Sequence, residues 1–207
     1  MEQTFLNISK DRPDEQFGHF TGKELYSRSL DAPKEHELSE QTVNAWNIVR
    51  DYYNKPLKIN STYRTKLHEL SLKKGFIGEH YYKRAIDGAF LTSVDQETLL
   101  PDFIAQILTQ GTLFKKLRNA GINGFGVYDT FVHLDSRPQN GLAHRDEFGT
   151  FAFWDNRTKI DGVQKPFFKS LWDGYGKEDG DLGVPKNDSR IVTLFLIGSF
   201  VAAFFFN

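Results

Sequence analysis

Apolar residues recur every three or four positions over residues 40–54, where Val43, Trp46 and Val49 fall on one side of a helix. Ser39 precedes this segment, and serine is a favoured helix N-cap because its hydroxyl accepts a hydrogen bond from the first turn. The same spacing predicts three further helices, over residues 65–75, 101–110 and 113–121.

Shorter segments have the alternating or continuously apolar character of strands. They cover residues 57–60, 83–91, 124–128 and 130–135, and an apolar segment over 151–157 closes the series. Helical and strand patterns are interleaved along the chain, and this mixture favours the α+β class. We expect a small antiparallel sheet flanked by helices.

The two ends of the chain differ from its middle. Residues 1–16 are polar, and we interpret them as a loose arm without a signal peptide before a domain over residues 17–157. Residues 158–190 have the composition of a polar linker. Residues 191–206 carry no charge. As a helix they would be about 24 Å long, against roughly 30 Å of hydrocarbon. We expect a membrane-inserted tail, with a buried terminal strand or helix as the alternative.

The amino-acid composition excludes several classes of function. The 207 residues include 26 basic and 27 acidic side chains. The resulting net charge of −1 argues against binding to nucleic acid through electrostatic attraction. Hydrophobic residues make up 39% of the chain, which excludes wholesale disorder. The absence of cysteine excludes disulfides, thiolate zinc sites, iron–sulfur centres and a cysteine nucleophile. Any metal must therefore be held by histidine and carboxylate side chains.

Two of the six histidines lie in strand-like segments that also carry aspartates. His80 precedes Asp87 by seven residues, and His133 lies between Asp129 and Asp135. The set of His80, Asp87 and His133 would suit Zn²⁺ and leave a fourth position for water. Because side chains alternate along a strand, Asp135 shares a face with His133 and can either support it or approach the metal water. Each fragment alone also fits a surface histidine beside a solvated acid.

Five short motifs occur in a characteristic order between residues 17 and 157. They are Phe20, Thr21 and Glu24; Asn60–Thr65; Gly78–His80 with Ala85 and Asp87; Gly124–Tyr128 followed by Phe131–Arg137; and Trp154 with Asp155. Together they resemble the zinc D-Ala-D-Ala carboxypeptidase and murein endopeptidase family, which is related to lysostaphin and the hedgehog domain. The resemblance implies a fold of the hedgehog or D-Ala-D-Ala peptidase type.

The resemblance also implies the roles of particular residues. It places zinc on His80, Asp87 and His133. It makes Arg64 a cation near the substrate carboxylate or the developing oxyanion, and a planar guanidinium suits either role. A salt bridge that pins the loop is the alternative for Arg64.

The chain departs from the family pattern at three positions. Gly78 replaces the usual serine, Lys83 replaces the usual glycine, and Thr130 stands where many relatives carry an acidic general base. Downstream, His144 and Asp146 are near enough in sequence to line a cleft, but we interpret them as loop residues.

Because Thr130 replaces the usual acid, two other residues are candidates for the general base. Asp129 is favoured because it lies one step from the usual position, and Asp135 is the other candidate. If neither reaches the metal water, the site binds zinc and turns over poorly.

These observations predict a zinc peptidase that hydrolyses peptidoglycan stem peptides, as a carboxypeptidase, murein endopeptidase or phage endolysin does. It would be membrane-associated through residues 191–206, and Lys186 and Arg190 weakly favour a cytoplasmic domain. The alternative is a non-catalytic, zinc-bearing module at a membrane that binds murein or a protein partner. A third hypothesis makes the tail the functional part, as in phage lysis proteins.

Overall fold

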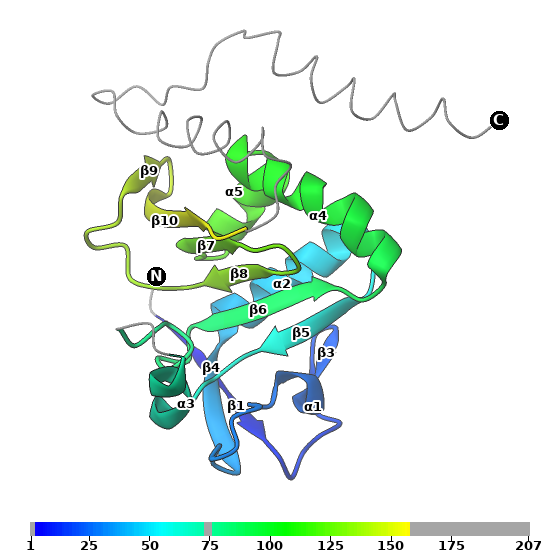
Figure 1. Ribbon diagram of the computed structural model, residues 1–207, viewed down its shortest axis with the longest axis vertical. Helices are drawn as coiled ribbons and strands as arrows, with labels where there is room; N and C mark the ends of the chain where they lie inside the picture. The colour runs from blue at the N-terminus through cyan, green and yellow to red at the C-terminus, as the bar shows by residue number, and fades with distance from the viewer. Residues whose placement is uncertain (1–2, 73–75, 158–207) are drawn as a thin grey trace, which may run out of the picture.

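The computed structural model describes residues 3–72 and 76–157, which form a mixed α/β domain with a six-stranded sheet and five helices (Figure 1). The predicted linker, residues 158–190, and the predicted membrane-inserted tail, residues 191–206, lie outside the described residues. Within the described part, none of the helices has the length and apolar character needed to cross a bilayer.

The main sheet has the strand order β5-β6-β8-β7-β10-β9. These strands are β5 (Leu57–Ser61), β6 (Ala85–Phe90), β8 (Val132–Asp135), β7 (Gly124–Val127), β10 (Gly149–Asp155) and β9 (His144–Asp146). Neighbours are antiparallel except β7 and β10, which run parallel, so the sheet expected to be antiparallel is mixed at this one pair. β8 is flanked by β6 and β7, and β10 pairs with the other edge of β7 in the same direction as β7.

Most predicted strands are confirmed with shifted bounds. Segments 83–91, 124–128 and 130–135 contain β6, β7 and β8, whereas 57–60 covers β5 except its last residue and 151–157 contains most of β10. His144 and Asp146, expected in a loop, instead pair with Phe151 and Gly149 of β10. A strand of three polar residues has no alternation that would reveal it.

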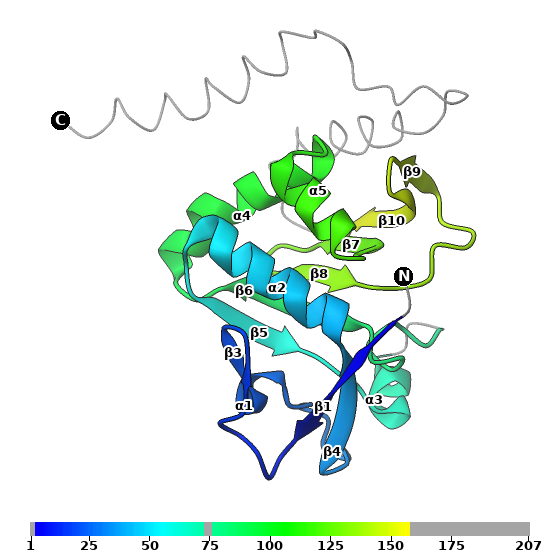
Figure 2. The ribbon, with the colours of Figure 1, turned by 180° about the vertical axis from the view of Figure 1, so that it is seen from behind.

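Three helices cover one face of the sheet, as the view from behind shows (Figure 2). They are α2 (Glu40–Tyr53), α4 (Ser93–Leu108) and α5 (Thr112–Asn119). Trp46 of α2 packs against β6 at Gly88, where a Cβ atom would lie 2.7 Å from the indole ring. Phe114 of α5 packs on Phe125 of β7 with ring centroids 5.1 Å apart. Because strand residues alternate between faces, the positions next to Gly88 and Phe125 point to the opposite face.

The helix predictions differ in how well their ends agree with the structure. The helices predicted over 40–54 and 113–121 are confirmed as α2 and α5, and Asn54 ends α2 with a left-handed φ of 49°. The helix predicted over 65–75 is α3 (Lys66–Ser71), and its predicted stop at Gly75 lies outside the described residues.

The prediction that a helix begins at Pro101 is wrong, because α4 already begins at Ser93. The Thr92 hydroxyl caps this earlier start by accepting a hydrogen bond from the Asp95 backbone N–H at 3.1 Å. Proline normally marks a helix boundary, but here burial of Phe103 and Ile107 against the sheet continues the helix through it.

Part of the segment predicted as an arm over residues 1–16 forms a strand. β1 (Phe5–Ser9) pairs with β4 (Glu35–Ser39), and Ile8 is fully buried. A two-stranded hairpin of β2 (Gln16–Phe17) and β3 (Phe20–Thr21) follows, and then the short helix α1 (Gly22–Leu25). A few apolar side chains spaced by polar ones are enough to dock a strand of this length.

Thr21 and Glu24, two residues of the first of the five sequence motifs, form a capping box at α1. Thr21 Oγ1 accepts from the Glu24 backbone N–H at 3.4 Å, and Glu24 Oε2 accepts from the Thr21 backbone N–H at 2.9 Å. Each side chain thus satisfies a backbone donor that the helix start leaves unpaired. In this chain the motif has a structural role.

Candidate metal centre

The candidate ligands lie on the face of the sheet opposite α2. Asp87 of β6 is the direct cross-strand partner of His133 of β8. His80 reaches the same place from the turn before β6, where its backbone carbonyl accepts from the Arg64 N–H at 3.2 Å. The structure therefore brings together the three residues predicted from the sequence, and all three are buried.

The atoms of these side chains converge on one carboxylate oxygen. Asp87 Oδ1 lies 2.7 Å from His133 Nδ1 and 3.1 Å from His80 Nε2. One ligand atom from each residue falls within 4.8 Å of the others. A cation seated among them would replace these mutual contacts, since each atom can offer it a lone pair.

The outer nitrogens of both histidines have partners of their own. His80 Nδ1 lies 2.5 Å from the Thr62 carbonyl oxygen, and His133 Nε2 lies 3.0 Å from Asp135 Oδ2. Both partners accept hydrogen bonds, so each outer nitrogen carries a proton. The inner nitrogen of each ring can coordinate a metal when that ring is neutral. Metal-ligating histidines in proteins are oriented in this way, and the residues present fit Zn²⁺.

The Arg64 guanidinium is hydrogen-bonded to the candidate ligand Asp87. Its Nη2 donates to Asp87 Oδ2 at 2.6 Å, and its Nη1 donates to Glu69 Oε1 at 3.3 Å. Glu69 Oε2 also accepts from the Gly78 backbone N–H at 2.9 Å, which ties α3 to the loop that carries His80. These are the contacts of the salt-bridge alternative for Arg64. Sequence reasoning missed Glu69, whose only local signal is a charge inside a short helix.

The two candidate bases stand in different surroundings. Asp135 is fully buried and accepts from the Arg137 backbone N–H at 3.0 Å, from Arg137 Nε at 2.7 Å, and from Arg137 Nη2. Asp129 is exposed in the turn between β7 and β8, next to Thr130, which is also exposed. Asp135 is thus hydrogen-bonded to the outer nitrogen of His133 and to Arg137, whereas Asp129 lies at the surface.

The charges of the cluster stabilise one another. Burial opposes ionisation of Asp87, but the charges and hydrogen bonds of His80 and His133 outweigh it and hold the pKa of Asp87 below its ordinary range. Burial likewise opposes protonation of His133, yet its hydrogen bonds to Asp135 and Asp87 raise its pKa to about 9. Burial lowers the pKa of His80. In the metal-free cluster the proton therefore resides on His133.

Aromatic side chains border the cluster on the β10 side. The Trp154 ring lies 5.2 Å from the His133 ring, and the Arg137 guanidinium lies 4.9 Å above Trp154. Trp154 Nε1 donates to the Tyr128 hydroxyl at 3.1 Å, and Tyr128 stacks on Phe131 at 4.2 Å. The last two of the five sequence motifs thus contact each other beside His133.

Glu79, which the sequence analysis did not single out, precedes His80 and has an unusual carboxylate. Within the described part of the chain its buried Oε2 has no hydrogen-bond partner and lies 3.6 Å from Arg84 Nη1. Burial, followed by the charge of Asp135, raises the pKa of Glu79. Adjacency to His80 is the only sequence signal that could have drawn attention to it.

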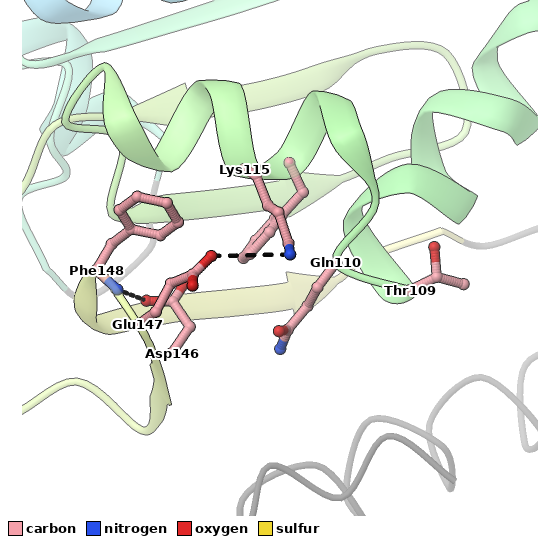
Figure 3. A pocket seen from close by; sticks show the side chains of 7 residues that line it. Thr109, Gln110, Lys115, Asp146, Glu147 and Phe148 are labelled. Atoms are coloured by element: carbon pink, nitrogen blue, oxygen red, sulfur yellow. Dashed lines mark hydrogen bonds and ion pairs between the residues drawn. The ribbon is translucent and has the colours of Figure 1, made fainter. Parts of the chain in front are cut away.

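Asp146 belongs to a separate part of the molecule. Its Oδ2 accepts from Arg118 Nε at 2.7 Å in a buried ion pair. It lines a cavity of about 240 Å³ between α5 and the β9–β10 hairpin, where Lys115 Nζ lies 3.8 Å from Glu147 Oε1 (Figure 3). Neither His144 nor Asp146 is part of the ligand cluster.

Comparison of the chain with protein-family models, curated proteins and solved structures finds no match.

Proposed function

We propose that the protein is a zinc-dependent peptidase that hydrolyses peptidoglycan stem peptides. The observation that carries the proposal is the convergence of His80, Asp87 and His133 on one point, with outer partners that orient both histidines. The family resemblance supplies the substrate class and a fold of the hedgehog or D-Ala-D-Ala peptidase type. Membrane contact through residues 191–206 belongs to the same proposal.

The residues around the proposed zinc site have separate roles. Zinc on a three-ligand site supplies a water of lowered pKa and polarises a carbonyl group. His80 Nε2, Asp87 Oδ1 and His133 Nδ1 would hold the ion. Arg64 keeps the second Asp87 oxygen engaged, so that Asp87 presents a single oxygen inward. Trp154 shields the ring of His133 on the β10 side.

Asp129 is the better of the two candidates for the general base. A base must accept a proton from the attacking water and pass it to the leaving amine. Asp135 is fully buried, and its oxygens already accept from Arg137 and His133. Asp129 is exposed in the turn that leads into β8, three residues before Val132. Of the two, we propose Asp129 as the base, because it also lies next to Thr130, the position of the acid in the family pattern.

The test uses the full chain and purified muropeptides. We expect D-Ala release or stem-peptide cleavage that a chelator abolishes and zinc restores. His133→Ala should abolish it, whereas His19→Ala, which changes an exposed histidine paired with Asp51, should not. Equal cleavage by the wild type and His133→Ala would rule out the proposed reaction.

A non-catalytic, zinc-bearing module that binds murein or a protein partner at a membrane is the second candidate. Thr130 in place of an acid favours it, as does the engagement of Arg64 by two carboxylates. Zinc bound at one ion per chain, with murein binding but no cleavage of any muropeptide, would select this function over the peptidase.

A further inference from the structure

We propose that Asp135 and Arg137 form a positioning pair that holds the His133 ring in its metal-binding orientation, with Nδ1 facing Asp87, before the ion arrives. Asp135 then acts through His133 and does not touch the reacting atoms. The inference rests on the proposed zinc site but not on peptidase activity, and it removes Asp135 from the candidate bases.

The geometry around His133 carries the argument. Asp135 Oδ2 lies 3.0 Å from Nε2, and Asp87 Oδ1 lies 2.7 Å from Nδ1, so the two carboxylates approach different nitrogens of one ring. A carboxylate only accepts hydrogen bonds, and Asp135 therefore keeps a proton on Nε2. Nδ1 is then the atom that can lose its proton and bind a metal. Such outer partners fix both the tautomer and the orientation of a ligand.

Arg137 holds Asp135 in place for this task. The Arg137 Nε and Nη2 atoms form a forked contact with both carboxylate oxygens, and the Arg137 backbone N–H adds a third hydrogen bond. The Arg137 guanidinium in turn lies over Trp154, whose ring borders His133. Asp135 thus has no freedom to swing toward the ligand cluster.

Gly124 provides the space that this arrangement needs. It lies opposite Asp135 in the β7–β8 pairing, and a Cβ atom there would overlap the Asp135 carboxylate. At Gly126, two residues along β7, a Cβ atom would overlap the Trp154 indole instead. The two glycines of the Gly-Phe-Gly motif therefore accommodate different side chains: Gly124 makes room for the Asp135 carboxylate, and Gly126 makes room for the Trp154 indole.

The experiment measures the zinc dissociation constant of the full chain by competition with a chelator. Asp135→Asn should weaken zinc binding by about 10- to 100-fold. The matched control is Asp146→Asn, which also breaks a buried aspartate–arginine pair but lies outside the ligand cluster; it should keep the wild-type affinity. In the zinc-loaded protein, ¹⁵N NMR should show a protonated Nε2 on His133, and Asp135→Asn should shift that signal.

A second pair of variants keeps every charge in place. Gly124→Ala should weaken zinc binding in the same direction as Asp135→Asn, and Gly126→Ala should weaken it less. The inference is overturned if Asp135→Asn and Gly124→Ala both bind zinc as the wild type does, or if Asp146→Asn loses as much affinity as Asp135→Asn. If His133→Ala also keeps full zinc affinity, the proposed metal site itself fails.

Discussion

Asp87 and His133 face each other across β6 and β8, and Asp87 Oδ1 lies 2.7 Å from His133 Nδ1. The register of this strand pair creates the contact, because a slip of one residue would turn one of the two side chains to the helix-covered face. The two residues are 46 positions apart in the sequence. The pairing of β6 with β8 therefore brings these two residues together. His80 reaches Asp87 from the turn before β6.

Zinc binding should release a proton from His133. The pKa of His133 in the metal-free cluster is raised to about 9, whereas the pKa of His80 is lowered, so only His133 is protonated at neutral pH. We expect about one proton released per zinc near pH 6.5, and an affinity that falls about tenfold for each pH unit below 9. Calorimetry in buffers of different ionisation enthalpy measures the proton count. A count near zero would contradict this charge assignment.

Asp129→Asn should lower kcat on muropeptides by about 10²- to 10⁴-fold, the usual contribution of a general base. Zinc content should stay at the wild-type level, because Asp129 is not among the ligand atoms that converge. Glu97→Gln, which changes an exposed acid on α4, serves as the control. Full activity in Asp129→Asn would move the base to another group, and Glu79→Gln would then be the next variant to assay.

Acid should destabilise the fold through His36. Its Nε2 accepts from the Ser27 backbone N–H at 3.0 Å, and burial lowers its pKa from the ordinary value of 6.5. The folded state therefore favours neutral His36, so this contribution is complete above pH 6.5 and is lost as the pH falls below 6.5 toward the lowered folded-state pKa.

Urea unfolding of the wild type and His36→Gln at about pH 7.5 and about pH 5.5 isolates this effect, because the other titrating groups are common to both proteins. The free energy of unfolding of the wild type should fall more between the two pH values than that of the variant. A difference between the two proteins that is the same at both pH values would contradict the account.

Gly88→Ala should destabilise the fold by about 1–3 kcal/mol, because the added methyl group overlaps the Trp46 ring. The smaller ring of Trp46→Phe should relieve part of this overlap, so the double variant should be more stable than the sum of the two single changes predicts. Strict additivity in urea unfolding would show that the two residues are not in the contact described.

The sequence predicted those parts of the fold that depend on local patterns. Helical spacing of apolar residues located α2 and α5, and alternation located the strands that carry Asp87 and His133. The direction of β10 depends on its pairing with β7, which no local pattern shows, and β9 consists of three polar residues without alternation. The early start of α4 depends on a cap at Thr92 that the proline at 101 obscured.

The candidate site was predictable in its ligands and less so in its surroundings. Histidine and aspartate spacing within the motif order pointed to His80, Asp87 and His133. A supporting role for Asp135 and a salt bridge for Arg64 were among the predicted alternatives, but the partners that decide between the alternatives were not predicted: Arg64 is paired with buried Glu69, and Asp135 is held by Arg137. These partners are set by packing at the sheet face and leave no spacing signal.

The most direct test of the central claim is the zinc content of the purified full chain after removal of loosely bound metal. The account predicts one zinc ion per chain in the wild type, and loss of that ion in each of His80→Ala, Asp87→Ala and His133→Ala, with His19→Ala unchanged. Wild-type protein that binds no divalent metal, or three variants that keep it, would contradict the account.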